Sequence, residues 1–356
     1  MLNTKMTMSI IGVVLALLAS TAKTQRTFSC VLPSLCKDGG TIDPRILIPG
    51  TSNPVVNIVV PTTSGNLESC PAGYIQCTNV ACGTPSVQPA TTDGFATQNA
   101  FPWQVFLRNN LNLGVKNGYV GGGALLSQYY VLTAAHKITN LTSVSVILGA
   151  YSTSNLAGTQ TSQVSGAWIH SNYNQQTLKN DIAVLQLATP MNIGGNTGIV
   201  CLPPAGQSFI GYSSASCIVS GWGQTNFSTD DAPTQTLKQV HVPIVTNEQC
   251  RTSYLNPSLL GNNADLYLDF PNEICAGGGA NQDACTQDGG SPLVCKNANT
   301  NDFSLVGLVI WGKNCGLAGV YGVYVSVPAY LTWIQCAMAC SRGTTTCSTC
   351  PATRFL

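Results

Sequence analysis

The sequence predicts an all-β domain, either a sandwich or a barrel, preceded by a small disulfide-stapled module in an exported chain. Three observations support this. Short β-rich runs separated by turn residues fill the chain from Phe101 to about Val327. An apolar segment opens the chain, and all 16 cysteines follow it.

The N-terminal segment has the pattern of a secretory signal peptide. Lys5 gives a positive start, Ser9 to Leu18 is apolar, and the small residues Ser20 and Ala22 are spaced like a cleavage site. The apolar run is too short to span a bilayer, which disfavours the alternative of a membrane anchor. We therefore expect a signal peptide at residues 1–22 and a secreted, extracellular protein without a membrane span.

The cysteine count and the charge limit the classes of function. An even, high number of cysteines in an exported chain predicts a disulfide framework. The three histidines are scattered, and no pair of CxxC motifs has zinc-finger spacing, so we expect no metal and no cofactor. Charged residues make up only 8% of the chain and the net charge is +1, which gives no indication of nucleic-acid binding.

Composition divides the chain into five segments. After the signal peptide, residues 28–82 hold five cysteines among Pro, Gly, Ser and Thr, and residues 83–97 are typical of a linker. Residues 98–336 carry the β-rich runs, and the stretch PAYLTWIQCAMA near their end has helical spacing, with Pro328 in the first turn. Residues 337–356 form a Cys-rich tail.

Five short motifs in the β-rich segment carry the chemistry. They are Pro102-Trp103-Gln104-Val105, Thr133-Ala134-Ala135-His136, Asn180-Asp181-Ile182-Ala183, Gly221-Trp222-Gly223 and the run from Asp283 to Leu293. Each motif is weak by itself, but the order and spacing of all five resemble those of the trypsin/chymotrypsin-like serine proteases. The resemblance covers about residues 98–336 and implies a chymotrypsin-like double β-barrel with a short C-terminal helix.

The resemblance implies a degenerate catalytic triad. His136 stands at the position of the general base and Asp181 at that of the residue that orients it. The nucleophile motif, normally Gly-Asp-Ser-Gly-Gly-Pro, reads Gln287-Asp288-Gly289-Gly290-Ser291-Pro292, so Gly289 replaces the serine. Ser291 would need a rebuilt loop to substitute for it. Gln287 departs from the glycine that the family has beside the oxyanion hole. We expect no enzymatic activity, and we expect His136 and Asp181 to be structural relics.

The activation switch of the family is also absent. Its members are cut after Arg or Lys to free an Ile-Val-Gly-Gly amine, which pairs with the aspartate matched here by Asp288. Neither a Lys or Arg between Cys82 and Trp103 nor that tetrapeptide is present. Asp288 is therefore expected to lack that partner.

The remnant of the specificity pocket keeps more of the family pattern. Asp283 matches the aspartate at the pocket floor that pairs with Arg or Lys in trypsin-like members. The pocket walls match Trp311, Gly312 and Gly322, whereas Ile310 replaces a serine. This pocket is either a binding site for a basic side chain of a partner or an evolutionary remnant.

Disulfide pairings follow from the resemblance. It implies the bridges Cys217–Cys295, Cys250–Cys275, Cys285–Cys315 and Cys82–Cys201. The family bridge beside the catalytic histidine is lost at both ends, where Gly121 and Lys137 stand. Four further cysteines, Cys336, Cys340, Cys347 and Cys350, allow three connectivities in the tail.

The N-terminal module resembles an arthropod clip domain. It retains Cys30, Cys36, Cys70 and Cys77, while Phe28 and Gln76 stand where the family has a third bridge. The resemblance implies Cys30–Cys70 and Cys36–Cys77. Because cysteine spacing underdetermines a fold, an unrelated disulfide-stapled peptide remains the alternative.

Two surface modifications are predicted from short patterns. Asn140 and Asn226 each begin a glycosylation triplet. The Arg45-Ile46 bond lies between Cys36 and Cys70, where a trypsin-like protease could cut and the disulfides would hold the pieces. An uncut strand edge is the favoured interpretation of this bond.

A clip-like module joined to a serine-less protease domain resembles the clip-domain serine protease homologues of arthropods. That family implies a binding cofactor or regulator of an extracellular protease cascade, as in prophenoloxidase-type innate immunity, with cascade proteases or prophenoloxidase as partners. The alternatives are a structural or adhesive protein, a decoy that binds inhibitors or substrates, and a weak serine endopeptidase that uses Ser291.

Overall fold

The computed structural model describes residues 28–31, 36–37, 41–42, 75–78, 82–111, 116–204, 206–224, 234–280, 283–285, 288–298, 301–341 and 351–354. The chain divides into two compact units, Met1–Val80 and Ala81–Leu356. The predicted signal peptide at 1–22 lies outside the described residues.

The first unit contains a small four-stranded sheet. Its strands are β1 (Phe28–Val31), β2 (Cys36–Lys37), β3 (Thr41–Ile42) and β4 (Ile75–Thr78), in the order β1-β4-β3-β2. β1 and β4 are antiparallel, with Cys30 opposite Gln76 and Ser29 opposite Cys77. Cys70 lies outside the described residues, so the two bridges implied for this module stay predictions.

A closed antiparallel barrel forms the first half of the second unit. Its strands are β6 (Gln104–Asn109), β7 (Tyr119–Ser127), β8 (Tyr130–Thr133), β9 (Val144–Leu148), β10 (Gln160–His170) and β11 (Ala183–Leu187). The sheet order is β11-β8-β7-β6-β9-β10, and a β10–β11 pairing closes it. The strand β19 (Ala352–Arg354), from the C-terminal tail, pairs with β10 at Trp168–His170.

A second, open sheet forms the other half. Its strands are β5 (Gly94–Phe95), β12 (Cys217–Gly221), β13 (Lys238–His241), β14 (Ile244–Val245), β15 (Glu273–Gly277), β16 (Pro292–Lys296), β17 (Phe303–Trp311) and β18 (Tyr321–Ser326). Their order is β14-β15-β18-β17-β16-β12-β13-β5. The two halves share an aromatic contact, because the Phe106 and Tyr119 rings of the first pack 5.6 and 5.8 Å from that of Trp222, which follows β12.

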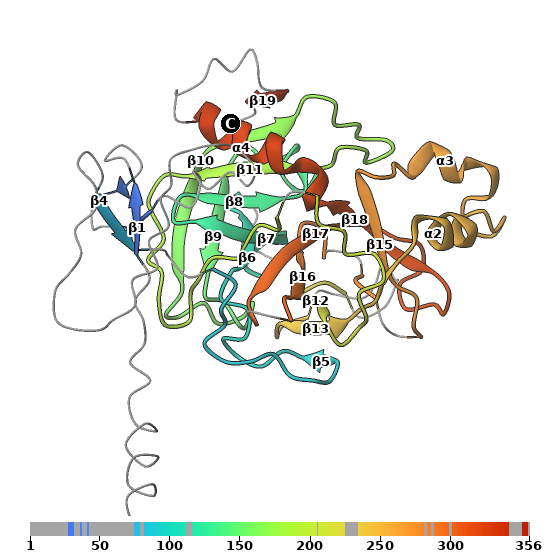
Figure 1. Cartoon of the computed structure of the whole chain (residues 1–356), viewed down its shortest axis with the longest axis horizontal. Helices are drawn as coiled ribbons and strands as arrows, with labels where there is room; N and C mark the ends of the chain where they lie inside the picture. Colours follow the sequence, from blue (N-terminus) through green and yellow to red (C-terminus); the bar gives the residue numbers. More distant parts are fainter. Residues whose placement is uncertain are drawn as a thin grey trace, which may run out of the picture. The chain divides into compact units, whose positions relative to one another are not determined.

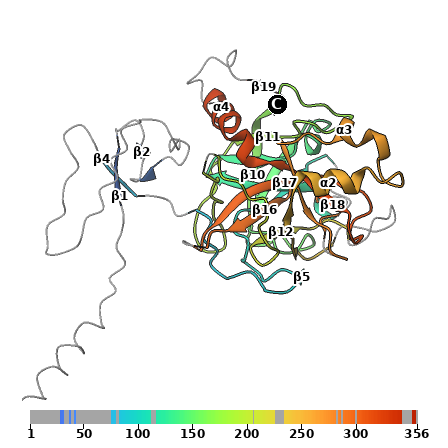
Figure 2. The same cartoon turned by 45° about the vertical axis from the view of Figure 1, so that its right-hand side comes forward.

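The helices are few and short. They are α2 (Asn247–Tyr254), α3 (Ala264–Tyr267), α4 (Leu331–Ser341) and the 3₁₀ turns η2 (Lys116–Gly118), η3 (Ala135–Lys137), η4 (Gly261–Asn263) and η5 (Val327–Tyr330). A capping box starts α2, since Thr246 accepts from the Gln249 N–H and the Gln249 side chain accepts from the Thr246 N–H. Figures 1 and 2 show α4 against β10 and β11.

The predicted chymotrypsin-like double β-barrel with a C-terminal helix is confirmed. The helix expected at Pro328 begins as the 3₁₀ turn η5 and continues as α4. The second unit contains the bridges Cys82–Cys201, Cys217–Cys295, Cys250–Cys275 and Cys285–Cys315, the four pairs that the resemblance implies. Cys336 and Cys340 are also disulfide-bonded. Among the described helices, none has the length and apolar character needed to cross a membrane.

Candidate functional site

His136 and Asp181 form a hydrogen-bonded pair between the two halves of the second unit. His136 lies in η3 just after β8, and Asp181 lies just before β11, the strand that pairs with β8. His136 Nδ1 is 2.5 Å from Asp181 Oδ2, and the His136 backbone N–H donates to Asp181 Oδ1 at 2.8 Å. The fully buried carboxylate thus orients the imidazole, and Nε2 is the ring nitrogen left to face the site.

Gly289 lies directly opposite that ring nitrogen. A Cβ built on Gly289 would be 2.6 Å from His136 Nε2, so this is the point from which a side chain would meet the imidazole. Backbone hydrogen bonds hold the surrounding turn: Gly122 N–H donates to Gly289 O at 3.0 Å and Gly290 N–H donates to Val309 O at 2.8 Å. The position matched to the nucleophile therefore has the expected place in space but provides no hydroxyl.

Ser291 points into the protein interior. Its side chain is fully buried, and its Oγ lies 2.2 Å from a Cβ built on Gly122 and 2.9 Å from one built on Gly221. These two glycines belong to β7 and β12, so the hydroxyl is enclosed between the two sheets. No substrate reaches a hydroxyl in that position without rearrangement of the turn.

Lys137 occupies the space beside Gly289, and sequence reasoning did not assign it to the site. A Cβ on Gly289 would be 2.2 Å from Lys137 Cε, and a Cβ on Gly121 would be 2.8 Å from Lys137 Cδ. Burial lowers the pKa of the Lys137 ammonium, against the attraction of Asp288 and Asp181. The sequence did offer one signal for Lys137. It directly follows His136 and stands at one of the two positions where the family's missing disulfide would be.

Asp288, which matches the aspartate that pairs with the activation amine in the family, accepts hydrogen bonds from two backbone groups. Its Oδ1 accepts from Gly223 N–H at 2.8 Å and its Oδ2 from Cys285 N–H at 3.0 Å. Burial raises the pKa of Asp288 to about 6, although these N–H groups and the cations Lys137 and Lys238 lower it. The loop therefore holds its aspartate without a cleaved N-terminus.

The residues matched to the specificity pocket divide between two neighbouring cavities. Trp311, Gly312 and Gly322 line a cavity of about 240 Å³ together with His136 and Gly289. Asp283 instead lines a second cavity of about 290 Å³, which also contains Asp288 and Lys238.

Asp283 lies directly behind the wall of the first cavity. Its Oδ1 is 2.7 Å from a Cβ built on Gly322 and has no hydrogen-bond partner among the described residues, while its Oδ2 accepts weakly from Gly316 N–H at 3.4 Å. Burial raises the pKa of this carboxyl to about 7. The acid matched to the pocket floor is thus present, with one oxygen left unsatisfied.

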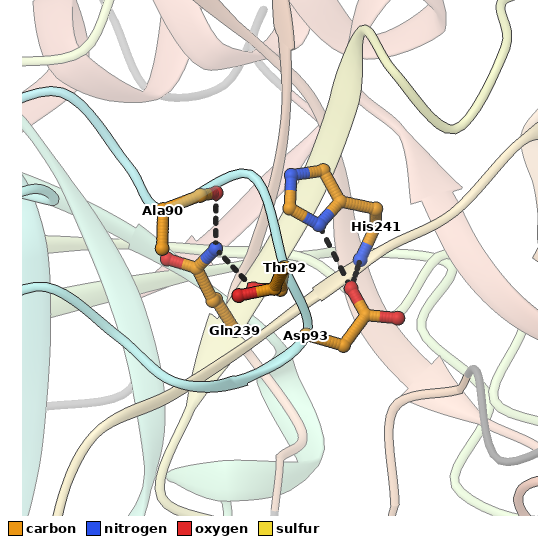
Figure 3. A network of polar contacts seen from close by, with 5 residues as sticks. All are labelled: Ala90, Thr92, Asp93, Gln239 and His241. Atoms are coloured by element: carbon orange, nitrogen blue, oxygen red, sulfur yellow. Dashed lines mark hydrogen bonds and ion pairs between the residues drawn. The ribbon is translucent and has the colours of Figure 1, made fainter.

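The segment predicted as a linker is attached to the second sheet. Gly94 and Phe95 pair with Gln239 and Lys238 as β5 and β13. The Gln239 side chain donates to Ala90 O at 2.7 Å and to Thr92 O at 3.1 Å. Figure 3 shows this network from close by.

Asp93 extends the same network. Its Oδ1 accepts from the His241 backbone N–H at 2.8 Å and lies 2.8 Å from His241 Nδ1, so the two side chains point toward each other in Figure 3. The segment ahead of the barrels is therefore held by side-chain hydrogen bonds as well as by strand pairing.

The remaining predicted sites can be placed more briefly. Asn140 is exposed, as glycosylation requires, whereas Asn226, Gln287 and the Arg45-Ile46 bond lie outside the described residues. Within the described part of the chain, no group of three His, Cys, Asp or Glu side chains is arranged to hold a metal ion.

Comparisons with known proteins agree with this architecture. The trypsin family model matches residues 93–334. Inactive CLIP domain-containing serine protease A3 of Aedes aegypti is 36% identical over 341 residues, which cover 90% of this chain and 69% of that protein. Phenoloxidase-activating factor 2 of Galleria mellonella is 36% identical over 262 residues, 70% of this chain and 84% of that protein. Protein masquerade of Drosophila melanogaster is 35% identical over 240 residues, which cover 65% of this chain and 21% of the masquerade protein.

Proposed function

The chain belongs to the trypsin family, among its clip-domain serine protease homologues, and we propose that it is a secreted protein that acts by binding and not by hydrolysis. Its role is that of a cofactor or regulator in an extracellular protease cascade of the prophenoloxidase type. Its partners are cascade proteases or prophenoloxidase. The disulfide content supports an extracellular location, since such bridges persist in oxidising compartments.

The absence of a hydroxyl opposite His136 is the observation that carries the non-catalytic part. Gly289 stands at that place, and the enclosed Ser291 is no substitute. A histidine–aspartate pair activates a nucleophile but does not replace one. The Aedes relative, whose name describes it as inactive, supports the same conclusion.

The cascade part rests on the Galleria relative, which is named as a phenoloxidase-activating factor. A rigid barrel pair would present one surface to the partner, and the module at 28–82 would add a second, which raises avidity when both bind. Among the described residues Asp283 Oδ1 has no hydrogen-bond partner, and it lies directly behind Gly322 in the wall of the remnant pocket. This supports a role for that pocket in receiving a basic side chain.

A serine-reactive fluorophosphonate probe tests the non-catalytic proposal. We expect no labelling of the secreted protein under conditions that label activated trypsin fully. Labelling that disappears in a Ser291→Ala variant would contradict the proposal and establish the weak endopeptidase.

Affinity capture from body fluid tests the cascade role. The tagged protein should enrich prophenoloxidase or clip-domain proteases, and an Asp283→Asn variant should recover less of a partner held through the remnant pocket. Recovery of matrix or cell-surface proteins without cascade members would favour the adhesive role instead. Recovery of protease inhibitors alone would favour a decoy.

A further inference from the structure

The side chain of Lys137 runs through the centre of the former catalytic site. Its Cγ and Cδ lie 2.9 and 2.8 Å from a Cβ built on Gly121, and its Cε lies 2.2 Å from one built on Gly289. His136 Nε2 is 2.6 Å from that same point on Gly289. Lys137 Cε and His136 Nε2 are therefore no more than 4.8 Å apart, the sum of those two distances. The lysine thus reaches the place where a nucleophile would meet the imidazole.

The surroundings of the Lys137 amine shift its pKa downward. Burial lowers the pKa of Lys137, and the acidic groups near it are Asp288 and Asp181, which oppose that effect. Asp181 is already bonded to His136 and Asp288 to two backbone N–H groups. Within the described part of the chain, Lys137 takes part in no ion pair.

The cavity beside this amine has room for a small, flat molecule. It measures about 240 Å³ and is lined by Val309, Ile310 and Trp311 as well as by Lys137 and His136. Pockets for drug-sized ligands span ~300–1,000 Å³, so this one suits a smaller ligand. An aromatic ring suits such a lining, because Val309, Ile310 and Trp311 contribute apolar side chains to it.

We propose that Lys137 is a nucleophilic amine that forms an imine with a small aromatic aldehyde bound in this cavity. The lysine amine and a base that is itself oriented by a carboxylate line the same cavity, and covalent catalysis by amines uses such a pair once the two groups come within hydrogen-bond reach. The relevant residues are Lys137 as nucleophile, His136 as base and Asp181 as its orienting partner. This site does not depend on the proposed cascade role.

The step balances without any oxidant. The Lys137 nitrogen attacks the carbonyl carbon, forming a C–N bond as the carbonyl π bond breaks. The attack leaves two protons on the nitrogen and a negative charge on the oxygen. His136 transfers the first of these protons to the oxygen, which becomes a hydroxyl, and then the second, so that the hydroxyl leaves as water while the nitrogen lone pair forms the C=N bond. The product is an imine on Lys137, and addition of water reverses the reaction.

Reductive trapping tests the site in the full secreted protein. We would incubate it at pH 7 with 2-hydroxybenzaldehyde and sodium cyanoborohydride and map the labelled lysines by mass spectrometry. The exposed Lys313 is an internal control on the same molecule. We expect Lys137 to be labelled several-fold faster than Lys313, because burial lowers the pKa of the Lys137 amine and so increases its neutral fraction at that pH.

Two comparisons separate reaction from mere accessibility. Labelling of Lys137 should reach its plateau at a lower pH than labelling of Lys313, and a His136→Ala variant should lose at least tenfold in rate at Lys137 alone. Lys137→Arg keeps the charge but forms no imine, so that peptide should carry no label. Labelling of Lys137 no faster than that of Lys313 in the wild-type protein would overturn the proposal, even if neither variant folds.

Discussion

A Cβ at position 289 and the Lys137 side chain compete for the same space, which makes their energetic coupling measurable. The Cβ of a Gly289→Ala variant would lie 2.2 Å from Lys137 Cε, whereas ordinary contacts are 3.4–4 Å. The lysine must therefore withdraw by at least 1.2 Å, the difference between 3.4 and 2.2 Å. Gly289 does not have a positive φ, so backbone strain adds nothing to this effect.

The magnitude follows from the cost of overpacking. Extra methyl groups in a packed site typically cost about 1–3 kcal/mol. Because Lys137 Cε is near the end of a flexible side chain that lines a cavity, we expect Gly289→Ala to lie at the lower end of that range. Lys137→Ala removes the main obstacle but leaves His136 Nε2 at 2.6 Å, so relief is partial. The double variant should then be less destabilised than the sum of the single variants by about 1 kcal/mol.

Denaturant unfolding at pH 7 with intact disulfides measures this cycle. All five tryptophans lie in the unit Ala81–Leu356, so tryptophan fluorescence reports on the unit that contains the site. Gly166→Ala combined with Lys137→Ala is the matched control. Its Cβ would collide with the Trp168 ring at 2.6 Å and not with the lysine, so those two changes should be additive. Additivity within about 0.5 kcal/mol for Gly289 and Lys137 would refute the assigned position of the lysine.

Three further predictions concern the scaffold. Burial raises the pKa of Glu273 to about 8 and that of Asp283 to about 7, so the folded state binds protons more tightly than the unfolded chain and stability falls as pH rises from about 5 to 8. The melting temperature should therefore be lower at pH 9 than at pH 6, and Glu273→Gln should make it less dependent on pH. An unchanged pH dependence in this variant would contradict the raised pKa of Glu273. Asp93→Ala removes both hydrogen bonds to His241, so hydrogen exchange and limited proteolysis of residues 83–97 should accelerate, and unchanged protection would argue against that anchor. Thr246→Ala breaks the capping box of α2 and should cost about 1 kcal/mol in denaturant unfolding, whereas Thr246→Ser should cost little.

Much of the fold was predictable because the relevant signals are local. Short β-rich runs between turn residues identify strands, and the five motifs determine their order in space. Pro328 correctly marked the start of the last helical segment, and only the 3₁₀ form of its first turn went unpredicted. That form depends on how the chain packs as it leaves β18, which periodicity does not reveal.

The candidate site was harder to predict, because the side chains that occupy it are determined by residues far apart in sequence. His136, Asp181 and Gly289 come together as the motifs imply. The path of the Lys137 side chain, however, depends on the lack of a Cβ at Gly121 and Gly289, which lie elsewhere in the chain. The placement of Asp283 in the second cavity likewise depends on how its loop folds, which the motif itself does not specify.

The segment 83–97 shows a different limit of sequence reasoning. Its Pro, Gly and Thr content is typical of a linker, yet Asp93 and Gly94 are joined to β13. Composition reports that a segment lacks regular periodicity. It does not report whether polar side chains on a distant strand, here Gln239 and His241, will bind its backbone.

Three substitutions in the degenerate centre are physically linked. Lys137 fits only because neither Gly121 nor Gly289 has a Cβ, and each glycine would clash with the lysine if replaced. The buried carboxylates Asp181 and Asp288 attract the ammonium, but burial outweighs that attraction and lowers the pKa of Lys137. Returning a serine to position 289 alone therefore places its Cβ against Lys137 and not in an open site. On the proposed non-catalytic function, recovery of protease activity requires at least two changes, and a Gly289→Ser variant should be labelled by a fluorophosphonate far less than Gly289→Ser with Lys137→Ala.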